Sequence, residues 1–439
     1  MNLENKVYNK IKGYVLIKGG KIYDPFLNIN KKSDILIKDG IIKKIAGNIS
    51  IKDNYTVLQC NQKIITNGFI DLHSHFMEPG FEIKETVESG SMAAFYGGYT
   101  RVCVMPNTLP VVDTPELVTH LISKAESLPV YVFPIGAISK GQDGTELSEI
   151  GGMVDSGAVA ISDDGLPVKN SQILRMALEY AKKFDIPVIN HAEDNCLVNE
   201  GLINEGSQSV RLGLTGNPDI AESTMIFRDL SIADYVSGKI HIPHVTSKKS
   251  VDIINEFKSK GVDVTAEVTP HHLCLTEDIV KKYNTSAKVA PPIRALEDKK
   301  ALIDGIKEGV IDCVATDHAP HTIEDKEKDF KHAPCGMIGL ESAFGLVNKT
   351  LSKEKMSIHS IINLFTIKPS KIFNIKPNLI EEGNIAELNI IDPNFKWTFT
   401  KGDIKSKSQN SPVLGMELLG KVLVTINKGY ISNCKASNS

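Results

Sequence analysis

The sequence predicts an α/β fold, namely a (β/α)8 TIM-like barrel with a small β-sandwich domain formed by the N- and C-terminal segments. Three observations lead to this prediction. From residue 68 onward, short β-rich runs alternate with helical patterns, which is typical of a parallel sheet. Both ends of the chain are β-rich and flank this single alternating unit. No glycine-rich phosphate loop follows the first run, so an open doubly wound sheet is disfavoured.

The alternating unit contains eight β-rich runs, as a (β/α)8 barrel requires. They cover residues 69–75, 100–105, 130–135, 158–162, 187–191, 239–244, 262–268 and 312–316. Between these runs, residues 171–184 and 248–260 carry apolar side chains at steps of three and four, the pattern of amphipathic helices. Strands and helices therefore alternate through the whole middle of the chain.

The domain boundaries follow from the two β-rich ends. Residues 15–59 indicate short strands separated by turns, and residues 384–392 and 421–430 show the same pattern. We therefore expect residues 1–66 and 379–439 to pair into the small β domain, and residues 67–378 to form the barrel. The sequence shows neither an internal repeat nor a low-complexity tract.

Composition restricts the class of partner. Hydrophobic residues make up 41% of the chain and charged residues 23%, which is ordinary for a globular protein. The 50 basic and 53 acidic side chains are interleaved and give a net charge of -3, so neither nucleic acid nor an anionic membrane is an expected partner. We expect a small-molecule substrate, no membrane span, a cytoplasmic location, and seven cysteines that remain free thiols.

Candidate metal ligands stand at the ends of several runs. His73 and His75 close the first run, and residues i and i+2 of a strand face the same side, so both imidazoles can bind one ion. Later runs end on further ligand types, which are Asp163 and Asp164, His191, His244, and Asp317. Barrel enzymes place their chemistry at these carboxyl ends, so the set predicts a site for two zinc-like divalent ions.

Each of these residues also has a structural interpretation. A single histidine at a strand end is more often structural than a ligand, and Asp-Asp-Gly is usually a turn. Their joint occurrence on successive strand ends favours the metal site. Two neighbouring cations need a shared carboxylate, which either Asp163 or Asp164 can supply, and Asp317 can accept the proton of an attacking water. Six other histidines fit the pattern less well and are expected to be structural or supporting residues: His241, His271, His272, His318, His332 and His359.

At these residues the chain resembles the amidohydrolase superfamily, and within it most closely the zinc dihydroorotases of bacterial pyrimidine synthesis. The resemblance extends over almost the whole chain. It depends on residues 68–75 (GFIDLHSH), 78–80 (EPG), 105–108 (MPNT), 162–165 (SDDG), 191–194 (HAED), 265–272 (TAEVTPHH) and 316–321 (TDHAPH). Together these motifs are highly specific.

The resemblance implies reversible ring closure of N-carbamoyl-L-aspartate to L-dihydroorotate in UMP biosynthesis, with a metal-bridging hydroxide attacking in the ring-opening direction. It implies two Zn2+ ions per chain, a homodimer, and association with aspartate transcarbamoylase as a further possibility. Roles carried over by motif are as follows: His73 and His75 bind one metal, His191 and His244 bind the other, Asp164 bridges, Asp317 is a ligand and the general acid/base, and Asn107 and His321 contact substrate.

The chain departs from the family pattern at three positions. Met77 stands where the family has an arginine that grips the substrate carboxylate, Ala290 replaces an asparagine that contacts substrate, and Cys335 replaces the aromatic residue before Gly336. Losing one charge-assisted contact costs about 1.5 to 3 kcal/mol. Arg294 or a nearby lysine is the expected replacement for the arginine. Residues 321–336 are expected to form a mobile lid or a wall over the site.

Two other functions compete with this interpretation. Met77 and Ala290 are compatible with a different cyclic amidohydrolase of the hydantoinase or allantoinase type, although those relatives generally bridge their metals with a carboxylated lysine and the fourth run contains none. A non-catalytic dihydroorotase-like scaffold subunit for aspartate transcarbamoylase is the second alternative. Such scaffolds commonly lose metal ligands, whereas this chain keeps every ligand that the resemblance implies.

Overall fold

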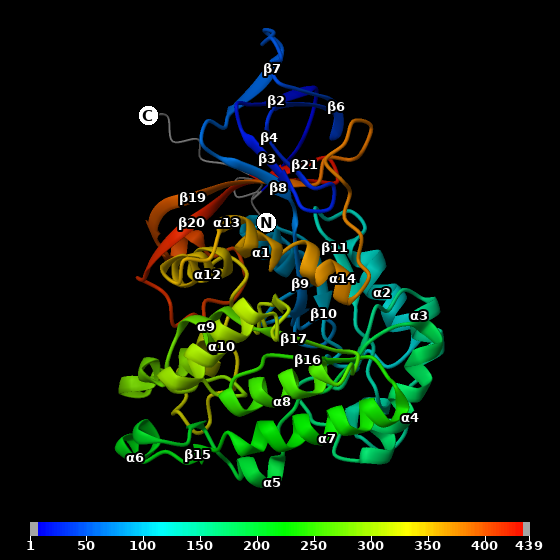
Figure 1. Cartoon of the computed structure of the whole chain (residues 1–439), viewed down its shortest axis with the longest axis vertical. Helices are drawn as coiled ribbons and strands as arrows, with labels where there is room; N and C mark the ends of the chain where they lie inside the picture. The colour runs from blue at the N-terminus through cyan, green and yellow to red at the C-terminus, as the bar shows by residue number, and fades with distance from the viewer. Residues whose placement is uncertain (1–7, 433–439) are drawn as a thin grey trace.

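The structure is a computed structural model that describes residues 8–432. Two regions are visible in Figure 1, a β-rich region at the top that contains β2 to β8 and β21, and a larger α/β region below it. Cys434, one of the seven cysteines predicted to be free thiols, lies outside the described residues. No disulfide joins any two of the six cysteines inside this range. Within the described residues, no helix is both long and apolar enough to cross a membrane.

Each of the eight predicted runs contains a strand, and neighbouring strands pair in parallel. The strands are β9 (Phe69–Ser74), β10 (Tyr99–Val104), β11 (Tyr131–Pro134), β12 (Ile161–Ser162), β13 (Val188–Ile189), β16 (Ile240–Ile242), β17 (Val264–Val268) and β18 (Cys313–Val314). They form two sheets, with the orders β11-β10-β9 and β12-β13-β16-β17-β18. Sequence order and spatial order therefore coincide within each sheet.

The edges of these two sheets are joined by backbone contacts at both ends. Next to β11 and β12, Gly136 and Ile161 form a parallel bridge. Next to β9 and β18, Ser74 and His318 form another, and the backbone N–H of Asp317 donates to the carbonyl of His73 at 2.9 Å. The parallel arrangement brings the carboxyl ends of all eight strands to the same side of the molecule.

Several strands are shorter than the predicted runs. The fourth and fifth runs were expected over residues 158–162 and 187–191, but β12 and β13 contain two residues each. Part of the difference in length comes from residues at the strand ends that are not paired with a neighbouring strand. One of them is Asn190, whose side-chain oxygen accepts a hydrogen bond from the N–H of Val168. Residues at a strand end that position functional side chains do not continue the regular pairing.

Helices surround the parallel strands. They are α1 (Val87–Gly97), α2 (Pro115–Ala125), α3 (Ile150–Asp155), α4 (Ser171–Ala181), α5 (Asn195–Val198), α6 (Ser207–Leu212), α7 (Ile220–Val236), α8 (Lys248–Ser259), α9 (Pro270–Cys274), α10 (Leu296–Glu308), α11 (Ile323–Lys326), α12 (Ala343–Lys353), α13 (Ile358–Asn363) and α14 (Ile367–Ile372). Helices α4 and α8 match the two predicted amphipathic stretches. In α8 the side chain of Ser247 caps the N-terminus, and Val251, Ile254 and Phe257 are buried at three-residue spacing.

The β-rich region combines strands from both ends of the chain. One sheet has the order β1-β21-β20-β19-β8-β3-β4, and the other has the order β6-β5-β2-β7. Their bounds are β1 (Tyr8–Lys10), β2 (Tyr14–Lys18), β3 (Lys21–Asp24), β4 (Ile29–Lys32), β5 (Asp34–Lys38), β6 (Ile41–Ala46), β7 (Tyr55–Gln59), β8 (Ile64–Asn67), β19 (Leu388–Thr398), β20 (Glu417–Asn427) and β21 (Tyr430–Ser432). Ile17 and Ile37 from one sheet share a buried apolar cluster with Ile65 and Ile426 from the other.

Two features were not expected from the sequence. A short parallel pair, β14 (Ile203–Asn204) and β15 (Gly216–Asn217), lies in the connection between β13 and α7. Strand β19 begins in the predicted run 384–392 but continues through Thr398, and β20 begins at Glu417, before the predicted 421–430. The bulge between Asp392 and Lys396 explains the extension, because irregular pairing interrupts the alternation that sequence patterns detect.

Candidate metal centre

Five strand ends converge on one cluster of imidazoles and carboxylates. His73 lies within β9 and His75 just after it. The other ligand candidates follow their strands by two or three residues, Asp164 after β12, His191 after β13, His244 after β16 and Asp317 after β18. His244 and Asp317 have left-handed backbone dihedrals, with φ of 35° and 47°. Such conformations are costly for residues with a side chain and are concentrated at functional sites.

Asp164 lies at the centre of the four histidines. Its Oδ2 atom is 3.4 Å from His73 Nε2 and 3.5 Å from His75 Nε2, and its Oδ1 atom is 3.7 Å from His191 Nδ1 and 3.5 Å from His244 Nε2. One carboxylate oxygen therefore faces each histidine pair. These residues make two groups, each of two histidines and Asp164, whose ligand atoms are close enough to hold one metal ion.

The adjacent carboxylate, Asp163, is turned away from the histidines. It accepts hydrogen bonds from the backbone N–H groups of Ile138 and Ser139 at 2.8 and 3.1 Å, and from the Ser139 hydroxyl. Asp163 therefore holds the connection after β11 against the end of β12. Of the two candidates left open by the sequence, the structure brings Asp164 to the imidazoles.

Asp317 lies beside the first histidine pair. Its Oδ1 atom is 3.1 Å from His75 Nε2 and 3.6 Å from His73 Nε2. Burial alone would raise the pKa of Asp317, but the charges of His75, His73 and His244 outweigh burial and hold this pKa below its usual range. The carboxylate is therefore ionised at neutral pH and able to accept a proton.

Supporting residues fix the ring orientation of three histidines. His73 Nδ1 donates to Glu267 Oε1 at 2.8 Å, and His75 Nδ1 donates to the amide oxygen of Asn107 at 2.9 Å. His191 Nε2 is 3.1 Å from Glu193 Oε2. Each bond leaves the other ring nitrogen, with its lone pair, facing Asp164, which is how proteins orient metal-binding histidines.

The donor atoms fit a pair of divalent cations. His73 Nε2 and Asp164 Oδ1 are buried and have no hydrogen-bond partner among the residues that the structure describes. His191 Nδ1 and His244 Nε2 face each other at 3.1 Å. Burial disfavours unpaired polar atoms, and a divalent ion between the imidazoles and the carboxylate would give them a partner. Imidazole nitrogens with carboxylate oxygens are a ligand set that suits zinc.

The electrostatic field of the site favours positive charge. Burial lowers the pKa of His73, yet the carboxylates of Asp164 and Glu267 outweigh burial and raise this pKa well above its ordinary value. Burial also opposes protonation of His191, but Asp164 and Glu193 raise its pKa to about 10. The same carboxylates attract a metal cation, whose binding displaces these protons.

A cavity of about 300 Å³ opens beside the cluster. It is lined by the candidate ligands His75, Asp164, His191, His244 and Asp317 together with all six predicted substrate-side residues, which are Met77, Asn107, Ala290, His321, Cys335 and Gly336. A side chain at position 336 would meet Ala319 and His321 within 2.9 Å, and φ there is 131°, so the close approach requires glycine. The structure thus brings every predicted site residue to one place.

The segment 321–336 is held against the rest of the fold. The ammonium group of Lys288 donates to the carbonyls of Phe330, Lys331 and Ala333 at 2.7 to 2.9 Å. His321 Nε2 donates to the carbonyl of Cys335 at 2.7 Å. These contacts favour the wall over the mobile lid, because three carbonyls in the segment share one buried cation.

Sequence reasoning gave no role to Glu267, Glu193 and Lys84, although all three support or line the site. Glu267 contacts both His73 and His241, at 2.8 and 3.1 Å. Its signal in the sequence was a carboxylate inside the apolar run 262–268. Burial raises its pKa, but His241 and His73 lower it to about 2, so the side chain stays ionised between them.

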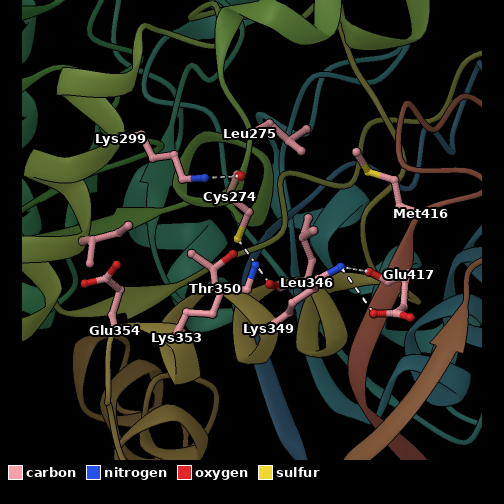
Figure 2. Close-up of a pocket in the computed structure, with 11 residues that line it drawn as sticks. Cys274, Leu275, Lys299, Leu346, Lys349, Thr350, Lys353, Glu354, Met416 and Glu417 are labelled. Carbon is pink, nitrogen blue, oxygen red and sulfur yellow. Dashed lines mark hydrogen bonds and ion pairs between the residues drawn. The ribbon is translucent and has the colours of Figure 1, made fainter.

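A second cavity, of about 350 Å³, lies between α9, α10 and α12 and contains none of the predicted site residues. Figure 2 shows that two of its lysines already have partners. Lys299 donates to the carbonyl of Cys274 at 2.6 Å, and Lys349 donates to the carbonyl of Glu417. These two lysines are therefore used in holding α10 to α9 and α12 to β20.

The comparisons with known proteins agree with this geometry. Residues 62–250 match the family model described as Dihydro-orotase-like. The fold resembles the L-hydantoinase (dihydropyrimidinase) of Arthrobacter aurescens with a TM-score of 0.81, at 23% identity and 95% coverage of each chain, and a D-hydantoinase (dihydropyrimidinase) of Thermus sp. with a TM-score of 0.77, at 24% identity and 95% and 94% coverage. These solved structures share the overall fold of this chain.

Sequence relatives define the family more closely. The chain is 44% identical over 419 residues to a dihydroorotase of Acetivibrio thermocellus, which covers 95% of this chain and 98% of that protein. It is 41% identical over 418 residues to a dihydroorotase of Trichlorobacter lovleyi, with the same coverage. The chain therefore belongs to the dihydroorotase family.

Proposed function

We propose that the chain is a zinc-dependent dihydroorotase that interconverts N-carbamoyl-L-aspartate and L-dihydroorotate. The observation that carries this proposal is the position of Asp164, whose two oxygens each face one histidine pair. Family membership at 44% identity over nearly the whole chain supports the same reaction. His73, His75, Asp164, His191, His244 and Asp317 would hold two Zn2+ ions.

When bound, the ions would lower the pKa of a water and polarise the carbonyl of the ring amide. In the ring-opening direction, Asp317 takes the proton of the attacking water as the new C–O bond forms. It then returns this proton to the ring nitrogen as the C–N bond breaks, and ring closure follows the same steps in reverse. Asp317 begins as a carboxylate, as the first role requires.

The cavity walls orient the substrate. The oxygen of Asn107 is occupied by His75 Nδ1, which leaves its amide N–H groups for a substrate oxygen. His321 donates through Nε2 to Cys335, and its Nδ1 atom is buried without a hydrogen-bond partner in the described part of the chain. Burial, with the charges of nearby lysines, lowers the pKa of His321 to about 3. A neutral His321 can therefore accept a hydrogen bond from a ring N–H.

A second candidate, hydantoin hydrolysis, is favoured by one specific observation. Met77 lines the cavity where the resemblance predicts a carboxylate-binding arginine, and hydantoins lack that carboxylate. A direct assay distinguishes the two reactions. Zinc-loaded protein should hydrolyse dihydroorotate, followed by ring absorbance, and a chelated sample should not. Hydrolysis of hydantoin without hydrolysis of dihydroorotate would reject the dihydroorotase proposal.

We also propose a domain organisation for this function. Backbone contacts at both sheet edges support a closed (β/α)8 barrel over residues 67–378. The pairing of β8 with β19 supports a small β-sandwich domain from residues 1–66 and 379–439. The homodimer and the association with aspartate transcarbamoylase stay predictions.

A further inference from the structure

The carboxylate of dihydroorotate needs a cationic partner, and one residue in the cavity offers it. Among the described residues that line this cavity, Lys84 is the only lysine or arginine, and it stands in the same loop as Met77. We infer that Lys84 binds the substrate carboxylate in place of the arginine expected at position 77. This inference rests on the proposed dihydroorotase function and names the residue that selects the carboxylated ring.

The other expected replacement, Arg294, is already engaged elsewhere. Its Nε donates to the Thr246 hydroxyl at 3.1 Å, and its Nη1 donates to the side chain of Asn204 and the carbonyl of Asn217. Arg294 is buried and is not among the residues that line the cavity. Its Nε and Nη1 atoms hold the β14–β15 connection in place, and its Nη2 atom, although without a hydrogen-bond partner among the described residues, lies outside the cavity lining, so Arg294 is not placed to bind a ligand there.

The backbone around Lys84 is fixed by several contacts. The N–H of Phe81 donates to the carbonyl of Met77, and the N–H of Lys84 donates to the carbonyl of Phe81, both at 2.9 Å. The hydroxyl of Ser408 donates to the carbonyl of Lys84 at 2.7 Å. The next residue, Glu85, is fully buried and accepts hydrogen bonds from Ser406 and from the backbone of Lys407. The side chain therefore extends from a rigid base.

The ammonium group itself is available. Lys84 Nζ lies 5.4 Å from the centre of the Phe81 ring, and in the described part of the chain it has no carboxylate within ion-pair distance. A cation over an aromatic face is held in place without being neutralised. The positive charge also reaches across the cavity, because it contributes, after burial and Lys326, to the lowered pKa of His321. Lys84 therefore lies within electrostatic range of His321, and its ammonium group forms no ion pair within the described residues.

The test compares rings with and without the carboxylate. Lys84→Met removes the charge while keeping an unbranched side chain, and it should raise KM for dihydroorotate about ten- to hundredfold, the usual effect of losing one charge-assisted contact. Binding of orotate to the zinc-loaded protein, measured by calorimetry, should weaken by the same factor. Binding of uracil, which has the ring without the carboxylate, should not change. Lys84→Arg should retain most of the affinity for orotate.

Lys331→Met is the matched control. Lys331 is an exposed lysine on the wall segment, paired with Glu200 at 3.2 Å, and does not line the cavity. Its loss should leave KM and orotate binding unchanged. Adding Met77→Arg to the Lys84→Met variant should restore orotate binding, because it places a guanidinium where the resemblance predicts one. This rescue would show that Lys84→Met had folded and had lost only the cation.

The possible outcomes distinguish a failure of the Lys84 assignment from a failure of the proposed function. Wild-type turnover of dihydroorotate with an unchanged KM and unchanged orotate binding in Lys84→Met would overturn the assignment of Lys84 and leave the proposed function standing. Equal weakening of orotate and uracil would also overturn it, since the effect would then concern the ring. A zinc-loaded wild-type chain without dihydroorotate turnover would reject the proposed function and, with it, this inference.

Discussion

The two sides of the active-site cavity differ in how closely they follow the family pattern. On the metal side, all six proposed ligands are present, buried and oriented by partners such as Glu267 and Asn107. On the carboxylate side, methionine and alanine stand where arginine and asparagine are expected. We therefore expect the metal-dependent step to be retained and substrate binding to depend on other residues of the same loops.

Asp164→Ala should have the largest effect on the metal side. Its loss leaves both histidine pairs without their shared carboxylate, so we expect loss of bound zinc and a fall in kcat/KM of at least about 10³-fold. Metal content per folded chain and steady-state kinetics measure these effects. The matched control is Asp163→Asn, which should cost stability because it weakens bonds to Ile138 and Ser139 but should keep the zinc. The reverse pattern would assign the bridge to Asp163.

Asp317→Asn should come next. The amide cannot accept the proton of the attacking water, so kcat should fall about 10²- to 10⁴-fold, with little change in KM. Steady-state kinetics in the ring-opening direction measure the split between the two constants. A variant whose kcat stays within a factor of three of the wild type would assign the proton transfer to another group.

Glu267→Gln should have an intermediate effect. The substitution keeps the size of a side chain that contacts both His73 and His241 but removes its charge. Removing the hydrogen-bond partner of a metal-binding histidine typically lowers metal affinity about ten- to hundredfold, so zinc should bind more weakly by that factor. Competition with a chromophoric chelator measures this affinity. An unchanged affinity would mean that the charge of Glu267 is not needed to orient His73.

Met77→Arg should have the smallest effect. If Lys84 already holds the carboxylate, a second cation has no unpaired partner, and KM for dihydroorotate should stay the same or rise slightly. A tenfold decrease in KM would mean that the carboxylate is unpaired in the natural chain. The metal side of the cavity would then be complete, and the carboxylate side would lack its cation.

Much of the metal side could be predicted from the sequence, because strand ends are marked by periodic patterns and each ligand follows one of them. The choice between Asp163 and Asp164 could not be derived from the residues alone, since it depends on how the backbone turns after β12. The proposed role of Lys84 and the contacts of Lys288 could not be predicted from the sequence either. Each is a long side chain on a connecting segment, and its direction is set by contacts with residues distant in the chain, such as Ser408 and Phe330.

The most direct test of the account is a zinc titration of metal-free protein, with bound metal and dihydroorotate hydrolysis measured at each step. Zinc binding should saturate at two ions per chain, and turnover should appear as the site fills. A chelator should abolish this turnover. Two tightly bound ions without any turnover of dihydroorotate would contradict the proposed function. Full turnover in the absence of bound metal would contradict the role given to Asp164 and the four histidines.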